Sequence, residues 1–165
     1  MTACSQKILL LDVEKCTGCR ICELACSFEK EKKFDPAKSR ISVISWFKEG
    51  LSIPILCQQC DAAPCVDACP AAAIERCAET GIVKIDSERC IGCKLCMAMC
   101  PFAAISIDEL GRIVKCDLCG GSPRCVELCP TGALSYEYAT KATVARRVEA
   151  AERLSELLRK YTRSG

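Results

Sequence analysis

Residues 90–101 read Cys90-Ile-Gly-Cys93-Lys-Leu-Cys96-Met-Ala-Met-Cys100-Pro101, a C-x2-C-x2-C-x3-C spacing that dictates how the surrounding chain must fold. Two-residue gaps in a tight loop place three sulfurs on one concave face, as three corners of a small cuboidal metal cluster require. Gly92 lets the backbone turn closely, so that amides can point at sulfur. We expect the fourth cysteine to start a helical turn and to point away, toward a second cluster.

The same spacing occurs in Cys16-Thr-Gly-Cys19-Arg-Ile-Cys22-Glu-Leu-Ala-Cys26, where Gly18 takes the place of Gly92. Two further motifs have a longer gap before the third cysteine, and Pro64 and Pro123 stiffen these gaps. Their cysteines are Cys57, Cys60, Cys65 and Cys69, and Cys116, Cys119, Cys125 and Cys129. Because residues 12–22 match residues 86–96 and residues 65–74 match residues 125–134, the chain reads as a duplicated two-motif unit.

Cysteine supplies 18 of the 165 residues, and these thiols must compensate for a small apolar core. A lone C-x2-C pair is as typical of zinc as of iron, but four complete motifs, three of them followed by proline, favour iron–sulfur clusters. Disulfides fit poorly, because no secretory leader or twin-arginine start is visible; we therefore expect a cytoplasmic protein with reduced thiols. Cys4 and Cys77 lack spacing partners, so we expect Cys4 in a loose N-terminus and Cys77 packed as a small hydrophobe.

Composition excludes several classes of function. Histidine is absent, which removes imidazole ligands and every catalytic triad that uses histidine. The formal net charge of +2 indicates no preference for nucleic acid, and bound clusters with their thiolates would make the loaded protein acidic. No apolar run approaches the roughly 20 residues of a membrane span.

Short hairpins are predicted between the cysteine motifs. Paired strand-like runs flank turn residues at 41–47 and 51–56, at 73–77 and 82–86, and at 104–108 and 112–116. A further strand-like run covers residues 8–11, and the charged segment Glu29–Lys38 is predicted to be a surface loop. Residues 140–161 lack glycine and proline and carry one apolar stripe, which predicts an amphipathic helix in a tail with seven basic and three acidic residues.

Over residues 7–138 these motifs resemble the four-cluster, ferredoxin-like electron-transfer subunits of molybdenum and tungsten oxidoreductases. In size the chain is most similar to the small subunits of tungsten aldehyde oxidoreductases and of the tungsten benzoyl-CoA reductase complex. Ser27 replaces the proline that usually follows the first motif. The resemblance implies an α+β, duplicated bacterial-ferredoxin-like fold, with two modules of two [4Fe-4S] clusters, short antiparallel hairpins and a C-terminal helix.

The resemblance also implies how the cysteines pair, whereas the linker lengths alone would equally suit other local modules. One predicted cluster is held by Cys16, Cys19, Cys22 and Cys129, and a second by Cys26, Cys116, Cys119 and Cys125. A third is held by Cys57, Cys60, Cys65 and Cys100, and the fourth by Cys69, Cys90, Cys93 and Cys96. The expected organisation is a four-cluster domain at 1–138, with an outer module at about 7–40 and 109–138, an inner module at about 52–108, and a helix at 139–165.

The function implied is electron transfer without catalysis, because complete cysteine ligation leaves no open iron for a substrate. The expected partner is a tungsten or molybdenum pterin catalytic subunit, with a further redox subunit or soluble ferredoxin at the other end. The alternative is a free polyferredoxin, or a ferredoxin-like subunit linking carbon monoxide dehydrogenase, formate dehydrogenase or hydrogenase. Docking is expected through the hairpin Ile41–Leu56, which carries Trp46 and Phe47, and through the basic tail; copies could also stack head to tail.

Overall fold

In the computed structural model the described residues are 7–140, together with residues 144, 145, 148, 149, 152, 153, 155, 156 and 159 of the tail. The strands are β1 (Lys7–Leu11), β2 (Ser42–Trp46), β3 (Leu51–Ile55), β4 (Ile74–Arg76), β5 (Val83–Ile85), β6 (Ile105–Ile107), β7 (Ile113–Lys115) and β8 (Leu134–Tyr138). The α-helices are α1 (Ile21–Glu31), α2 (Pro64–Asp67), α3 (Leu95–Met99) and α4 (Arg124–Glu127). Short 3-10 turns are η1 (Val13–Lys15), η2 (Pro36–Lys38) and η3 (Leu118–Gly121).

The strands form four two-stranded antiparallel sheets. The three predicted hairpins are confirmed as β2–β3, β4–β5 and β6–β7. In the fourth sheet β1 pairs with β8, so that Lys7 lies opposite Tyr138 and the two ends of the cysteine-containing region are joined. A strand near residues 8–11 is expected from the sequence, whereas β8 is not. The result is a small α+β protein with short hairpins and few helices.

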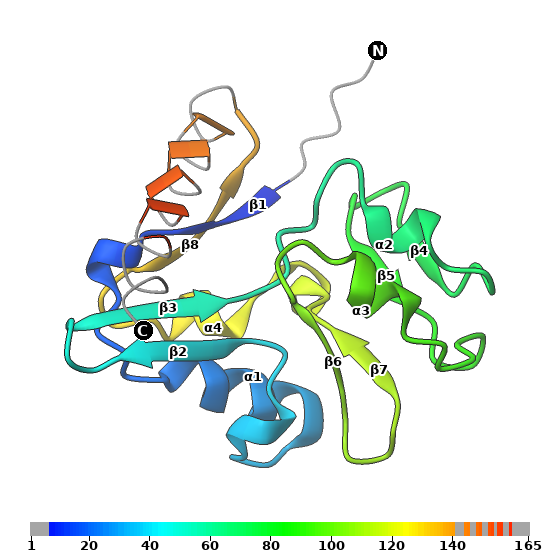
Figure 1. Ribbon diagram of the computed structural model, residues 1–165, viewed down its shortest axis with the longest axis horizontal. Coiled ribbons are helices and arrows are strands. Elements are labelled where there is room, and N and C mark those ends of the chain that lie inside the picture. The colour runs from blue at the N-terminus through cyan, green and yellow to red at the C-terminus, as the bar shows by residue number, and fades with distance from the viewer. Residues whose placement is uncertain are drawn as a thin grey trace.

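Two hydrophobic cores lie in different parts of the protein. Figure 1 shows α2, α3 and β4–β7 on one side and α1, α4, β1, β8, β2 and β3 on the other. The first core includes Leu9, Cys26, Leu118 and Leu134, and the second includes Ile74, Cys96 and Ile113. Because cysteines belong to both cores and further cysteines pack against them, the thiol groups take positions that larger apolar side chains would otherwise fill.

The segment Glu29–Lys38 contains no buried residue, as expected for the surface, but its prediction as a loop is wrong outside residues 32–35. Helix α1 continues to Glu31, and η2 covers Pro36–Lys38. The other three motifs have a proline after the fourth cysteine, and a residue that precedes proline disfavours the α conformation. Ser27 imposes no such restriction: it is fully buried, and its hydroxyl donates to the carbonyl of Leu24 at 3.0 Å.

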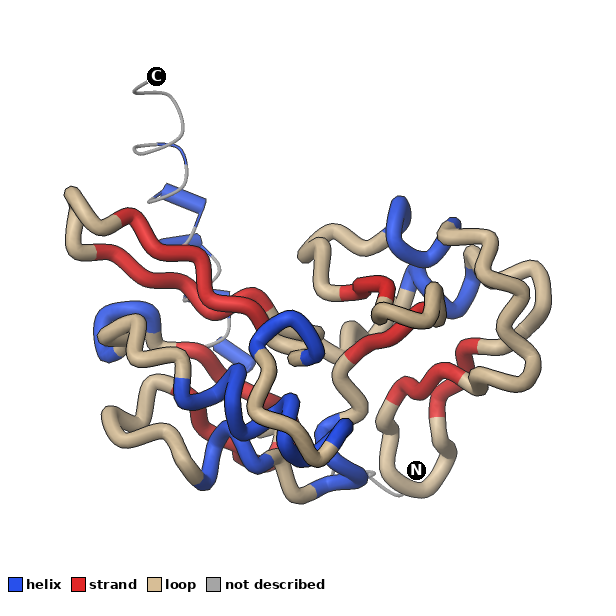
Figure 2. Tube along the Cα trace, turned by 90° about the horizontal axis from the view of Figure 1, so that it is seen from below, coloured by secondary structure: helices blue, strands red, loops and turns tan. Residues whose placement is uncertain are grey.

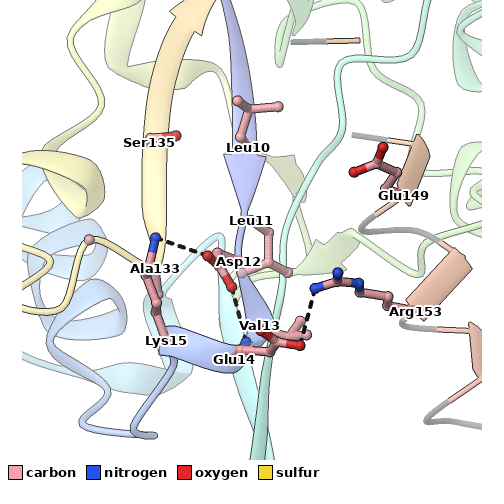
Figure 3. A pocket seen from close by; sticks show the side chains of 11 residues that line it. Leu10, Leu11, Asp12, Val13, Glu14, Lys15, Ala133, Ser135, Glu149 and Arg153 are labelled. Carbon is pink, nitrogen blue, oxygen red and sulfur yellow. Dashed lines mark hydrogen bonds and ion pairs between the residues drawn. The ribbon is translucent and has the colours of Figure 1, made fainter. Parts of the chain in front are cut away.

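The described tail residues are helical and exposed, as the amphipathic pattern predicts for its polar face. Val144 and Val148 of the apolar stripe are also exposed, and the remaining stripe residues lie outside the described part of the chain. Arg153 contacts the domain through an ion pair with Glu14 at 3.1 Å. Figure 3 shows this pair beside a cavity of about 230 Å³, which Asp12 and Ser135 also line. None of the described helices is both long and apolar enough to cross a membrane.

Candidate metal centres

One cavity is lined by cysteines from both the beginning and the end of the cysteine-containing region. Its walls include Cys16, Cys19 and Cys22 of the first motif and Cys129 of the last. Cys16 follows η1, Cys22 lies in the first turn of α1, and the β1–β8 pairing brings the residues after Cys129 beside η1. The loop between the first cysteines turns at Gly18, whose φ of 70° is in the left-handed region.

Two further cavities each contain four cysteines from two motifs. The first is lined by Cys57, Cys60, Cys65 and Cys100. The second is lined by Cys69, Cys90, Cys93 and Cys96. In both cavities the fourth cysteine of one motif joins the first three cysteines of the other, which is the arrangement that the family resemblance implies.

The remaining four motif cysteines are neighbours where α1 packs against α4. They are Cys26, Cys116, Cys119 and Cys125. Burial raises the pKa of Cys125, and the nearby Cys116, Cys26 and Cys119 raise it further. Burial also raises the pKa of Cys116 to about 12, with Cys57 and Cys26 among the neighbours that add to the rise. These neighbour effects place the four thiols close to one another.

Three motifs end in the same turn. After each Cys-Pro pair, the third residue after the cysteine has a positive φ and donates its amide to the carbonyl of that cysteine; these residues are Ala72, Ala103 and Gly132. The turn lets the next amide approach the cysteine sulfur: Ala73 N lies 3.2 Å from Cys69 Sγ, and Ala104 N lies 3.4 Å from Cys100 Sγ. Hydrogen bonds of this kind tune the reduction potential of a cluster whose thiolate accepts them.

Sulfurs of the first and last motifs also accept hydrogen bonds from backbone amides. Arg40 N lies 3.2 Å from Cys26 Sγ, and Leu118 N lies 3.4 Å from Cys116 Sγ. The expectation that the fourth cysteine starts a helical turn is wrong. The turn begins before the third cysteine, so Cys96 is inside α3 and Cys100 caps its C-terminus.

The donor set fits iron–sulfur chemistry. The residues that line the three cavities include four thiols each and no aspartate or glutamate, which is the soft ligand set that iron–sulfur clusters use. The seventeen described cysteines are free, with no disulfide among them. Within the described residues no three histidine, cysteine, aspartate or glutamate side chains converge closely enough to hold a single metal ion.

Cys77 does not pack as a small hydrophobe. It follows β4 in the turn toward β5 and is only half-buried, and hydrogen bonding from the side chain of Thr80 lowers the pKa of its thiol. The reason is that β4 ends at Arg76, one residue before Cys77. Cys4 lies outside the described residues.

Three buried polar residues near the thiols were not identified from the sequence: Glu23, Gln59 and Lys115. Glu23 accepts a hydrogen bond from Val43 N at 2.6 Å, while Arg20 donates to the Val43 carbonyl at 3.0 Å. Gln59 and Lys115 make the corresponding contacts with Val83. Because these partners are 20 to 32 residues apart, no local sequence pattern predicts the contacts between them.

Comparison with known families is consistent with this site. Residues 49–138 match the 4Fe-4S dicluster domain, and residues 13–29 match the 4Fe-4S binding domain. The chain is 44% identical over 116 residues to the polyferredoxin-like subunit of an aliphatic sulfonate oxidoreductase from Pyrococcus furiosus, covering 70% of this chain and 66% of that protein. It is 34% identical over 136 residues to the electron transport protein HydN of Escherichia coli, covering 68% and 75%.

A third relative is much longer than this chain. The beta subunit of NADH-dependent phenylglyoxylate dehydrogenase from Aromatoleum evansii is 38% identical over 120 residues, which cover 70% of this chain but 26% of that subunit. Among solved structures, the active-site complex BamBC of benzoyl coenzyme A reductase with benzoyl-CoA aligns with a TM-score of 0.50 and 23% identity. That alignment covers 94% of this chain and 90% of the other, and it supports the fold alone. The chain belongs to the 4Fe-4S dicluster-domain family of ferredoxin-like electron-transfer subunits.

Proposed function

We propose that this chain carries four [4Fe-4S] clusters and transfers electrons between a tungsten or molybdenum pterin catalytic subunit and a further redox partner. Bound clusters of this type supply reversible one-electron transfer. The observation that carries the proposal is that three separate cavities each contain four cysteines. The chain itself would supply sixteen thiolates, the amides that donate to them, and the apolar walls that exclude water.

The proposed ligand sets follow the family resemblance. Cys16, Cys19, Cys22 and Cys129 would hold the first cluster, and Cys26, Cys116, Cys119 and Cys125 the second. Cys57, Cys60, Cys65 and Cys100 would hold the third, and Cys69, Cys90, Cys93 and Cys96 the fourth. Because every set is complete, we propose no catalytic role for the chain. The free thiols of the described cysteines suit a reducing compartment, and we propose a cytoplasmic location.

We also propose a duplicated fold, with an outer module at about 7–40 and 109–138 and an inner module at about 52–108. Support comes from the Cys-Pro turn, which recurs in both modules. A linear order of the four sets has support from neighbouring thiols. Cys22 of the first set adds to the raised pKa of Cys125, and Cys57 of the third set adds to that of Cys116.

Two segments outside the thiol groups are the proposed docking elements. The β2–β3 hairpin is drawn in Figure 2 as long strands whose turn projects from the molecule. Phe47 at that turn is 87% exposed while Trp46 is half-buried, so one aromatic ring is available to a partner. The basic tail helix is the second element; a partner bound there could be the catalytic subunit or a second copy in a stack.

The test is iron analysis of anaerobically purified full-length protein. We expect about sixteen iron atoms per chain, four for each cluster. Cys93→Ser should lower the iron content and alter the electron paramagnetic resonance spectrum of one cluster. Cys77→Ser, the matched control outside the four sets, should change neither. About eight iron atoms in fully loaded protein, or stoichiometric zinc, would refute the four-cluster assignment.

A further inference from the structure

Lys115 is a buried lysine at the end of β7, with 7% of its surface exposed. Its ammonium donates hydrogen bonds to the carbonyl of Val83 and, at 2.8 Å, to that of Cys116. Within the described part of the chain, no carboxylate forms an ion pair with this ammonium. A buried charge is costly unless its donors are satisfied, and here two backbone carbonyls accept hydrogen bonds from the ammonium.

Gln59 makes hydrogen bonds to the same two residues, Val83 and Cys116, and forms a polar junction with Val83 and Lys115. Its side-chain oxygen accepts from Val83 N at 2.8 Å, and its amide nitrogen donates to the Cys116 carbonyl at 2.8 Å. Gln59 and Lys115 therefore hold both polar groups of Val83, as Glu23 and Arg20 hold those of Val43. The two arrangements differ in charge: Arg20 lies 3.6 Å from the Glu23 carboxylate, whereas Gln59, which corresponds to Glu23, is neutral. The junction of Gln59, Val83 and Lys115 therefore contains no acidic side chain.

The junction lies between two of the thiol groups. Lys115 lines the cavity of Cys57, Cys60, Cys65 and Cys100 and immediately precedes Cys116 of the neighbouring group. Burial raises the pKa of Cys65 and of Cys116, and the Lys115 charge opposes that rise at both thiols. One fixed positive charge therefore acts on two groups at once.

We propose that Lys115 raises the reduction potentials of the two middle clusters, those assigned to Cys57, Cys60, Cys65 and Cys100 and to Cys26, Cys116, Cys119 and Cys125. This inference rests on the proposed function. Reduction adds one negative charge to a cluster, and a nearby buried cation stabilises the reduced form because the surroundings screen the interaction weakly. Lys115 is thus a residue that tunes the clusters, separate from the cysteines that ligate them.

The experiment is a redox titration of the loaded full-length protein, followed by electron paramagnetic resonance. Lys115→Met and Lys115→Gln remove the charge, Lys115→Arg keeps it, and Lys84→Met removes an exposed lysine from β5 as the matched control. At a fixed solution potential we expect both neutral variants to lower the reduced-to-oxidised ratio of two clusters about tenfold, equivalent to 59 mV for one electron. The shift should persist at high salt, because a buried charge is screened little.

Three results would overturn the inference. The first is unchanged potentials in the neutral variants, and the second is an equal shift in Lys84→Met. The third is loss of iron from both neutral variants while Lys115→Arg stays loaded, which would make the role structural. Iron content in the same samples separates the two proposals: wild-type protein without about sixteen iron atoms contradicts the proposed function, whereas full loading with unmoved potentials contradicts only the role of Lys115.

Discussion

Gly18 and Gly92 occupy the same position in two cysteine motifs and have nearly the same backbone, with φ of 70° and 69°. Their surroundings differ. A methyl group on Gly92 would meet no atom within 4 Å, whereas one on Gly18 would overlap the hydroxyl of Ser52 and lie 3.1 Å from its Cβ. The Ser52 hydroxyl is also held at 2.9 Å by Ser45. Position 18 therefore needs glycine because of its left-handed backbone and because Ser52 leaves no room for a side chain. Position 92 needs glycine for its backbone alone.

We predict that Gly18→Ala destabilises the loaded protein more than Gly92→Ala. The left-handed conformation should cost either alanine about 1–2 kcal/mol, and only Gly18→Ala must also displace Ser52. The measurement is the denaturation midpoint under anaerobic conditions. Ser52→Ala, combined with Gly18→Ala, should restore part of the loss; equal midpoints for the two single variants would contradict the crowding at Ser52.

Glu23 illustrates a second requirement at the residue scale, because it is 3% exposed and satisfies the buried amide of Val43. Glu23→Ala should lower the free energy of unfolding by about 1–3 kcal/mol, since that amide is left without an acceptor. Glu23→Gln retains an acceptor oxygen and should lose less. Chemical denaturation of both variants tests this; if alanine and glutamine cost the same, the hydrogen bond to Val43 is not the cause.

At the scale of elements, a truncation that removes the tail helix must leave strand β8 intact. The strand runs to Tyr138 and pairs with β1 along its whole length, so a cut before that residue would disrupt the fold. The described contact of the helix with the domain is the Arg153–Glu14 pair, whose side chains are 61% and 71% exposed. An exposed pair of this kind contributes little to stability.

We predict that truncation after Thr140 leaves the iron content unchanged and weakens association with the catalytic partner. The tail after Thr140 holds seven basic and three acidic residues, a net charge that suits an acidic, cluster-bearing neighbour. The measurement is the stoichiometry of partner and truncated chain after affinity purification, with iron analysis of the same sample. Arg153→Ala in the full chain is the control for the ion pair alone. Unchanged stoichiometry would show that the helix is not the docking element.

At the scale of the whole molecule, the thiol groups connect segments that lie far apart in the sequence. Each of the three four-cysteine cavities draws its cysteines from two motifs, so bound clusters would cross-link distant parts of the chain. Burial raises the pKa of Cys22 and Cys116 to about 12. Without iron these thiols stay protonated, so repulsion between thiolates would contribute little, and lost cross-links would be the main consequence.

We therefore predict that removal of iron by a chelator unfolds the domain, because metal binding contributes directly to the folding free energy. Far-ultraviolet circular dichroism should show loss of strand and helix signal, and no cooperative melt should remain. Restoring iron and sulfide under reducing conditions should recover both signals. A chelated sample that keeps the native spectrum and melts cooperatively would contradict this dependence.

The sequence by itself determined the family, the cysteine motifs and three hairpins. Ligand spacing and turn glycines are local, and their geometry follows from a few neighbouring residues. The sequence also shows that Ser27 stands where the other motifs have proline. The consequence, which is the extension of α1 to Glu31, is seen only in the structure. The prediction of a loop over Glu29–Lys38 failed because charge and a nearby proline indicate exposure, and exposed residues can still be helical.

Only the tertiary structure decided which distant segments meet. The pairing of β1 with β8 joins residues 7–11 to residues 134–138. The junction of Gln59, Val83 and Lys115 connects a loop with the strands β5 and β7. Lys115 and Gln59 look like ordinary surface residues in the sequence, because burial of a polar side chain leaves no periodic signal. Their positions result from packing two cores against each other, where every buried donor and acceptor must find a partner from whichever segment lies within reach.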